Sequence, residues 1–266
     1  MAGVGIACLI GGVFVGRLWT PAPAPARLAA PTVRPMPARP VVRPQVALVI
    51  DDCGYHSTTL PLFERIDRPI TVAILPYHPY SRAVAELGAA PQFEVMLHLP
   101  MEPQPGQVPA RELEPHTLTT RMPATEVRER LRAALAGVPH VRGANNHMGS
   151  KATTDPALMR LVMQELKTQQ LYFIDSVVTS DSVCRTVARQ VGIRFAERSV
   201  FLDNENRAEA IQRQLRQLVA EARRRGSAIG IGHDRVLTLT VIRRMLPEME
   251  AAGVRFVHVS DVVKQL

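Results

Sequence analysis

Residues 46–56 read VALVIDDCGYH, five apolar residues followed by two carboxylates, a cysteine and a glycine. An apolar run of this length with a glycine close behind it is typical of a buried β-strand that ends in a turn. The run delivers Asp51 and Asp52 to the carboxyl end of the strand, where functional groups gather in parallel sheets. The same pattern recurs along the chain, and this recurrence predicts the fold class.

Short apolar runs and helical patterns alternate throughout residues 46–266. The expected strands are 46–50, 70–75, 93–97, 141–144, 171–174, 193–196, 227–231 and 255–259. Apolar residues that recur every three or four positions predict helices around 127–135 and 158–166, and over 208–225 and 239–252. Asp155 and Pro156 supply an N-cap and an N1 proline for the second of these helices. The alternation predicts one α/β domain with a mainly parallel sheet.

The residues before this domain have a different character. Residues 2–16 contain no charged side chain, and residues 20–45 are rich in Pro, Ala and Arg without a periodic apolar face. We expect 1–19 to be an uncleaved membrane anchor, with a cleaved signal peptide as second choice, and 20–45 to be a linker to a domain at 46–266. This order predicts a bacterial cell-envelope protein that faces the periplasm and is anchored in the inner membrane, or else a soluble periplasmic or secreted protein.

The charge of the chain does not indicate nucleic-acid binding. The sequence has 32 basic and 24 acidic residues, but five arginines and no acidic residue lie in residues 1–45, which leaves 27 basic residues for the domain. Nucleic-acid modules combine a basic face with aromatic or known recognition motifs, and the sequence contains one Trp and four Tyr without such a motif. We therefore expect no nucleic-acid partner.

Polar side chains follow most of the expected strands. The groups are Asp51-Asp52, His78, His98, Asn145-Asn146-His147, Asp175 and His233. Because the carboxyl ends of parallel strands meet at one edge, we expect these groups to lie close together. One such residue would be explained by a turn cap or a buried hydrogen bond, and it is the repetition that predicts a site.

Carboxylate and imidazole are the donors that zinc takes in catalytic sites. Asp52, His98 and His147 are therefore the candidate ligands of a divalent metal, with Zn²⁺ as the expected cofactor. His233 is a candidate acid or base, and Asp175 either holds that histidine or lines the substrate site. The candidate substrate contacts are Asn145, Asn146, His78 and Asp203, the last two with helix or turn capping as an equal alternative.

Seven motifs carry a family resemblance. They are VALVIDDCG, TVAILPYHPYSR, EVMLHLPMEP, NNHMGSKAT, LYFIDS, VFLDN and IGIGH, in this order. Together they resemble the divergent polysaccharide deacetylase family, which is related to the NodB-type carbohydrate esterases. The resemblance implies a distorted, incomplete (β/α) barrel and removal of acetyl groups from N-acetylated polysaccharides with a metal held by one Asp and two His. It also implies that Asp51 is the base, Asp52 a metal ligand and His233 the acid.

The sequence departs from the ordinary esterases at one ligand. Their two metal histidines share one H-[ST]-x-x-H motif, whereas Glu102 stands four residues after His98, so His147 must supply the second imidazole. The expected function is a metal-dependent hydrolase of an envelope polysaccharide or peptidoglycan-like glycan. The alternatives are a non-catalytic glycan-binding or scaffold protein with the same fold, and a peptidoglycan amidase or peptidase. The oligomeric state is not predicted.

Overall fold

The computed structural model describes residues 1–3, 5, 9, 11–12, 16–17 and 43–266. The expected anchor and linker therefore fall largely outside the described residues. Within the described residues, no helix has the length and apolar character needed to cross a membrane. Residues from 43 onward belong to one compact unit, and the description below concerns this unit alone.

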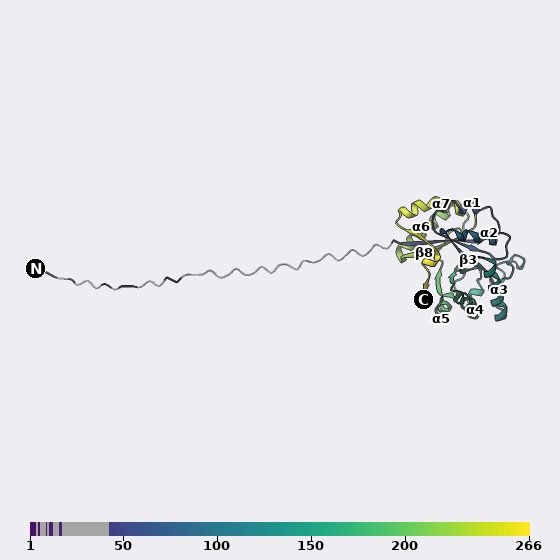
Figure 1. Cartoon of the computed structure of the whole chain (residues 1–266), viewed down its shortest axis with the longest axis horizontal. Helices are drawn as coiled ribbons and strands as arrows, with labels where there is room; N and C mark the ends of the chain where they lie inside the picture. Colours follow the sequence, from purple (N-terminus) through teal and green to yellow (C-terminus); the bar gives the residue numbers. More distant parts are fainter. Residues whose placement is uncertain (4, 6–8, 10, 13–15, 18–42) are drawn as a thin grey trace. The chain divides into compact units, whose positions relative to one another are not determined.

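A single sheet of ten strands forms the centre of this unit, curled into a half-barrel (Figure 1). The strands are β1 (Gln45–Cys53), β2 (Ile70–Ile74), β3 (Phe93–Met101), β4 (Val141–Met148), β5 (Tyr172–Asp175), β6 (Arg194–Glu197), β7 (Val200–Phe201), β8 (Ser227–His233), β9 (Arg255–Val257) and β10 (Lys264–Gln265). Their order is β10-β6-β5-β4-β3-β2-β1-β8-β7, and β9 also pairs with β1. Only β10 runs antiparallel to its neighbour among these strands, which confirms the expected α/β fold.

Helices connect the strands and cover the outer face of the sheet. They are α1 (Leu60–Phe63), α2 (Ser81–Ala85), α3 (Ala124–Gly137), α4 (Pro156–Thr168), α5 (Cys184–Val191), α6 (Ala208–Arg225) and α7 (Val236–Ala251). In Figure 1, α6 and α7 lie toward the top of the domain, and α3, α4 and α5 lie toward the bottom. The Asp155 side chain caps α4 by accepting hydrogen bonds from the backbone N–H groups of Ala157 and Leu158, both at 2.9 Å.

The two faces of the sheet form separate apolar clusters. In β1, Val46, Leu48 and Ile50 pack with the helices, whereas Ala47 and Val49 lie in the second cluster, on the concave face. This alternation follows from the two-residue period of a strand. The concave cluster also contains Met96 of β3, Ile174 of β5, Ile231 of β8 and four valines of the C-terminal segment 257–263.

Several boundaries differ from the expected ones. The sequence predicted that β3 would end at residue 97, but the strand continues through Pro100 to Met101. Proline is tolerated there because β2 ends at Ile74, opposite Leu97, so Pro100 lies beyond the last β2 partner. Helix α5 was not predicted although Cys184, Val187, Ala188 and Val191 recur at helical spacing. The two-residue strands β7 and β10 were not predicted because they are too short to show a period.

Candidate metal centre

The strand period explains why distant residues meet at the carboxyl edge. On the concave face, Asp51 continues the series of Ala47 and Val49, and His233 continues the series of Ile229 and Ile231. These two residues are register partners, because Asp51 pairs with His233 across β1 and β8. His98 pairs with Asn145 across β3 and β4, and His147 lies two residues further on the same face. One edge therefore receives side chains from four strands.

Asp52 breaks the alternation and is still brought into the site. A residue next to Asp51 would face the helices in a regular strand. Asp52 instead has φ of 61°, in the left-handed region, and the β1–β2 register shifts between Ile50 and Cys53. Aspartate adopts this conformation more readily than most residues because its short side chain bonds to nearby backbone. The irregularity turns the second carboxylate toward the same edge as the first.

The three predicted metal ligands converge. Oδ1 of Asp52 lies 3.0 Å from Nδ1 of His147 and 3.2 Å from Nε2 of His98, and the two nitrogens are 3.1 Å apart. A tetrahedral ion with bonds of about 2.1 Å separates its ligand atoms by about 3.4 Å, so the triangle is close to the size that a zinc-sized cation requires. Asp52, His98 and His147 thus form a candidate metal site, and their donor atoms suit such an ion.

Asn145 orients both a candidate ligand and the candidate base. Its side chain is fully buried, with Oδ1 2.8 Å from Nδ1 of His98 and Nδ2 2.8 Å from Oδ1 of Asp51. His98 therefore donates its Nδ1 proton to the amide, which leaves the Nε2 lone pair directed at the cation position. The sequence predicted a substrate contact for Asn145, whereas the structure gives it internal partners.

The local charges shift the pKa values of the site in different directions. Burial acts to lower the pKa of His98, but the carboxylates Asp51 and Asp52 outweigh it and raise that pKa to about 9. Burial raises the pKa of Asp51, although the positive charges of His98 and His233 oppose the shift. For Asp52, burial is outweighed by hydrogen bonds from His147 and His98, which hold its pKa well below the usual range. These hydrogen bonds therefore favour the ionised form of Asp52.

His233 forms a dyad with Asp203. Nδ1 of His233 donates to Oδ1 of Asp203 at 2.8 Å, and the backbone N–H of His233 and the hydroxyl of Thr238 donate to Oδ2 at 3.0 and 2.7 Å. Burial acts to lower the pKa of His233, but the bond to Asp203 raises it above the usual value. The free Nε2 lies 4.0 Å from Oδ2 of Asp52, so it faces the candidate metal site.

Asp175 was expected either to hold His233 or to line the substrate site, and the structure places Asp203 beside His233 instead. Asp175 follows the inward-facing Ile174 and so points to the other face, where it accepts hydrogen bonds from Val177 N at 2.8 Å and Ser182 Oγ at 2.6 Å. Asn146 likewise faces away from the centre and accepts a bond from the backbone of Ser176 at 2.9 Å. Both side chains support the loop after β5.

A polar cluster beside the centre was only partly foreseen. Nε2 of His78 lies 2.7 Å from Oε2 of Glu114, the hydroxyl of Tyr55 donates to Oε1 of the same carboxylate, and the Tyr55 and His78 rings are 4.1 Å apart. Burial followed by the charge of Asp52 raises the pKa of Glu114. The sequence pointed to His78 alone, because Glu114 lies in the long loop 102–123, where no periodic pattern fixes its position.

Glu102 does not join the candidate metal ligands. Its Oε2 accepts hydrogen bonds from the backbone and hydroxyl of Thr120 at 2.8 and 2.9 Å, and its Oε1 accepts one from Lys151 at 2.7 Å. These bonds tie the loop after β3 to the loop after β4. The position four residues after His98 is therefore structural in this chain.

Comparisons with known proteins identify the family of the chain. A model of the divergent polysaccharide deacetylase family matches residues 48–263. An uncharacterized protein of Haemophilus influenzae is 39% identical over 207 residues, which cover 77% of this chain and 72% of that protein.

Solved structures share the half-barrel. An uncharacterized protein from Agrobacterium tumefaciens superposes with a TM-score of 0.78 and 24% identity, covering 85% of this chain and 92% of that one. A CE4 family pseudoenzyme from Bacillus anthracis superposes with a TM-score of 0.52 and 11% identity, covering 84% of this chain and 66% of that one. The family match over most of the chain and the shared fold establish that the protein belongs to the divergent polysaccharide deacetylase family.

Proposed function

We propose that the protein is a metal-dependent hydrolase that removes acetyl groups from N-acetylated sugars of an envelope polysaccharide. The observation that carries this proposal is the convergence of one carboxylate oxygen and two imidazole nitrogens within 3.0–3.2 Å of one another. The donor set is the kind that zinc uses in catalytic sites. Family membership supports a polysaccharide substrate.

The site is buried on one side and exposed to solvent on the other, which suits a large substrate. The side chains of His98 and Asp51 are 3% and 4% exposed, whereas that of Asp52 is 30% exposed. The candidate site is thus anchored in the protein on one side and open to solvent on the other. A divalent cation held there, in our proposal Zn²⁺, would polarise the acyl carbonyl and activate a water molecule.

Asp51 and His233 then carry the protons. Oδ1 of Asp51 is held by Asn145, and its Oδ2 lies 3.7 Å from Nε2 of His98, beside the reacting position. Its raised pKa brings the carboxylate closer to the basicity that a general base needs. His233, kept protonated by Asp203, is placed to give a proton to the departing nitrogen through Nε2. His78, at the edge of the centre, is the proposed substrate contact.

The cellular location is part of the same proposal. The uncharged run at residues 2–16 and the Pro/Ala/Arg segment at 20–45 support a tethered envelope protein, in which the linker connects the domain to the inner membrane. An envelope glycan would then be within reach of the domain.

The test combines metal analysis with an assay on N-acetylglucosamine oligomers, in which released acetate and new amino groups are both measured. We expect the wild type to carry a divalent metal and to release acetate and amine in equal amounts. His147→Ala should lose both metal and activity. Asp51→Asn should keep the metal and lose roughly 10²–10⁴-fold in rate, the usual contribution of a general base.

Glu102→Gln is the matched control, because it changes the position at which ordinary esterases carry the second histidine. It should keep the metal content of the wild type. A metal-free wild type under metal-replete conditions would refute the metal site. Glycan binding without acetate release would favour the non-catalytic scaffold, and release of peptide from peptidoglycan would favour an amidase or peptidase.

A further inference from the structure

A groove rich in basic side chains lies outside the candidate metal centre. It begins as a cavity of about 720 Å³ between α3, α4 and α5, which is followed by cavities of about 490 and 670 Å³, and each cavity shares lining residues with the next. Lys167 lines the first two cavities, and Arg142 and Arg194 line the last two. We call this continuous surface the basic groove, and its cations are Arg128, Arg132, Arg142, Arg160, Lys167 and Arg194.

The acidic side chains in the groove do not neutralise these cations. Glu165 and Glu94 are the acids in its lining, and they are only 7% and 6% exposed. Glu165 is bonded by Arg132 through Nε at 2.7 Å and Nη2 at 2.9 Å. Glu94 accepts a hydrogen bond from the hydroxyl of the buried Tyr172 at 2.7 Å. Glu165 thus pairs with one cation of the groove and Glu94 with the buried Tyr172, and the other five cations have no acidic partner in the lining.

Neutral groups hold several of these cations in place. Arg160 donates to the amide oxygen of Gln190 at 2.6 Å, and Lys167 donates to the backbone oxygen of Val191 at 2.6 Å. Arg194 donates to the backbone oxygen of Gln170 at 3.3 Å. Such bonds position the side chains without cancelling their charge, so the groove is pre-organised for an anion.

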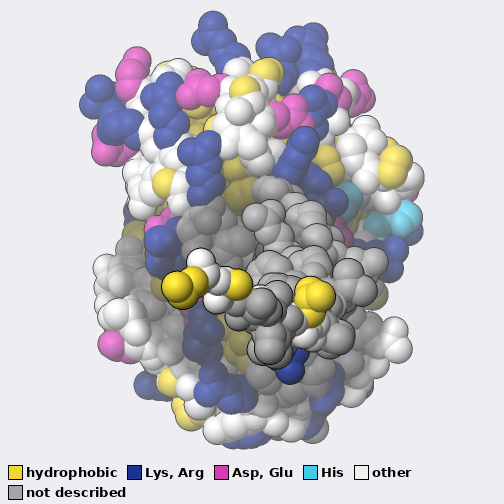
Figure 2. Space-filling view, turned by 90° about the vertical axis from the view of Figure 1, so that its left-hand side faces the viewer, with side chains coloured by type: hydrophobic (Ala, Val, Ile, Leu, Met, Phe, Trp, Pro, Cys, Tyr) yellow, Lys and Arg dark blue, Asp and Glu magenta, His cyan; other side chains and the backbone are white. Residues whose placement is uncertain are grey.

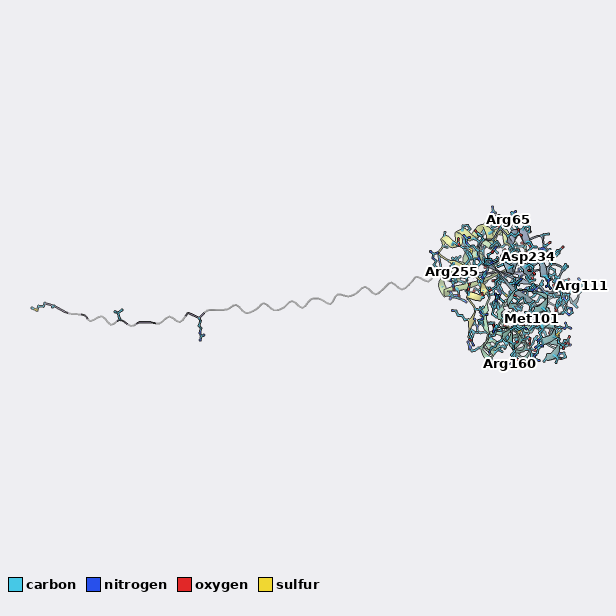
Figure 3. All side chains as sticks on the ribbon, viewed as in Figure 1. Arg65, Met101, Arg111, Arg160, Asp234 and Arg255 are labelled. Atoms are coloured by element: carbon cyan, nitrogen blue, oxygen red, sulfur yellow. The ribbon has the colours of Figure 1, made fainter. Side chains whose placement is uncertain are left out.

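The part of the groove lined by Arg142 and Arg194 lies at the amino edge of the sheet, opposite the metal centre. Arg194 begins β6, and Arg142 is the second residue of β4, whereas the candidate ligands follow the carboxyl ends of the strands. In Figure 3, Arg255 of β9 lies at the left of the domain, and Arg111 of the loop after β3 lies at the right. Figure 2 looks at the left-hand side, and the described surface in its lower half shows more dark blue than magenta side chains.

The polypeptide enters the domain at this same edge. β1 starts at Gln45, whose N–H bonds to the backbone oxygen of Gly226, and Arg255 N–H bonds to that of Pro44. The sequence before this point carries five arginines and no acidic residue. In a membrane-anchored chain, the linker would therefore join the domain at the edge where Arg142 and Arg194 lie.

We propose that the basic groove binds the phosphate groups of an anionic phospholipid membrane. Arginine suits this role because its planar guanidinium binds phosphate with two parallel hydrogen bonds. Nucleic acid fits less well, since single strands need exposed aromatic rings, and Tyr172 and Phe93, which lie at the groove, are buried. The proposal is independent of the hydrolase activity.

The expected contribution to membrane affinity is modest for each basic side chain and substantial for all the cations of the groove together. A basic side chain near an anionic membrane raises the partition constant by roughly fivefold. The attraction falls off over a Debye length of about 8–10 Å in physiological salt. The tether adds to this effect because it holds the groove at a high effective concentration near the surface.

The experiment uses the full chain reconstituted into vesicles of phosphatidylcholine, with or without phosphatidylglycerol, so that the N-terminal segment is treated identically in both. Amide hydrogen exchange is followed in peptides from α4 and from residues 188–194. We expect slower exchange in these peptides with phosphatidylglycerol, and loss of the difference at high salt. The double variant R142E/R160E should exchange at the same rate in both vesicles.

The matched control is R243E/R244E on α7, which makes the same change in net charge at two exposed arginines outside the groove. It should retain the wild-type difference. Equal exchange of the wild type in both vesicles, or equal loss of the difference in the two double variants, would overturn the proposal. Protection by inorganic phosphate or by polyglutamate in neutral vesicles would also overturn it, in favour of a soluble phosphate or an acidic protein partner.

Discussion

Asn145 is hydrogen-bonded both to a candidate metal ligand and to the candidate base. One side of its amide accepts from His98, and the other side donates to Asp51. A buried amide is suited to this role because it offers both an acceptor and a donor with a fixed separation. The metal ligand and the base are therefore oriented by one side chain, and substitutions at this position can separate the two effects.

We predict different outcomes for two substitutions of Asn145. Asn145→Leu removes both hydrogen bonds, so metal affinity should fall roughly 10–100-fold, as for other residues that orient metal ligands. Asn145→Asp still accepts from His98 and should bind metal more tightly than the leucine variant. It cannot donate to Asp51 and adds a negative charge, which raises the pKa of Asp51 and moves the acid limb of the pH–rate profile to higher pH.

Chelator competition and a pH–rate profile measure these two effects. Ser182→Ala is the control, since it removes a hydrogen bond to Asp175 on the opposite face of the sheet. It should change neither the metal affinity nor the acid limb. An Asn145→Leu variant with wild-type metal affinity would show that the amide does not orient His98.

The sequence predicted individual site residues where the strand period applies. Asp51, His98, His147 and His233 all lie on the concave face that the two-residue period assigns to them. The two-residue period does not predict that the Asp52 side chain faces the site. That direction depends on a left-handed backbone conformation, which an aspartate residue adopts only sometimes.

The partner of His233 could not be read from the sequence. Asp203 follows the two-residue strand β7, and so short a strand has no detectable pattern. Asp175 ends β5, which has a clear apolar pattern, but its side chain lies on the face of the sheet that points away from the candidate metal site.

At the level of elements, β4 packs against β5 at a glycine. A side chain at Gly143 would overlap the ring of Tyr172, which is fully buried and bonded to Glu94. We predict that Gly143→Ala lowers the free energy of unfolding by about 3 kcal/mol, the upper part of the range for overpacking a core. Urea denaturation followed by circular dichroism measures the change.

Gly137→Ala provides the comparison, because nothing lies within 4 Å of the added methyl group at the end of α3. This variant should be as stable as the wild type, or more stable by up to about 1 kcal/mol. Equal stability of the two variants would mean that Tyr172 can move aside without cost.

Elements with a clear apolar pattern were predicted well, including the short strands β2, β5, β6 and β9, whereas the two-residue strands β7 and β10 were not. Helix α6 has the predicted bounds, and β8 starts where predicted. The strands β1, β3, β4 and β8 extend past their apolar runs, because the polar residues that end each run still continue the ladder. Those extra residues are the ones that carry the candidate site.

At the level of the whole domain, metal binding should stabilise the fold. A ligand that binds only the folded state adds about 2.7 kcal/mol at a hundredfold excess over its dissociation constant. We predict that zinc raises the melting temperature of the wild type and leaves that of His147→Ala unchanged, as measured by differential scanning calorimetry.

The stabilisation should also depend on pH. His98, whose pKa in the metal-free protein is raised to about 9, must lose a proton to bind the cation. Between pH 7 and 9 the deprotonated fraction grows with pH, so apparent affinity should rise by about tenfold per unit, and the shift in melting temperature should grow. A shift that shrinks over this range would show that His98 is not a ligand.

The half-barrel is not closed, and its two outermost strands are β7 and β10, each of two residues. An open sheet normally offers a row of unpaired backbone groups to which another chain can add, and short border strands limit that row. We expect this domain to stay dispersed at high concentration although its sheet is incomplete. The half-barrel can thus remain open, because its short border strands offer few unpaired backbone groups to which another chain could add.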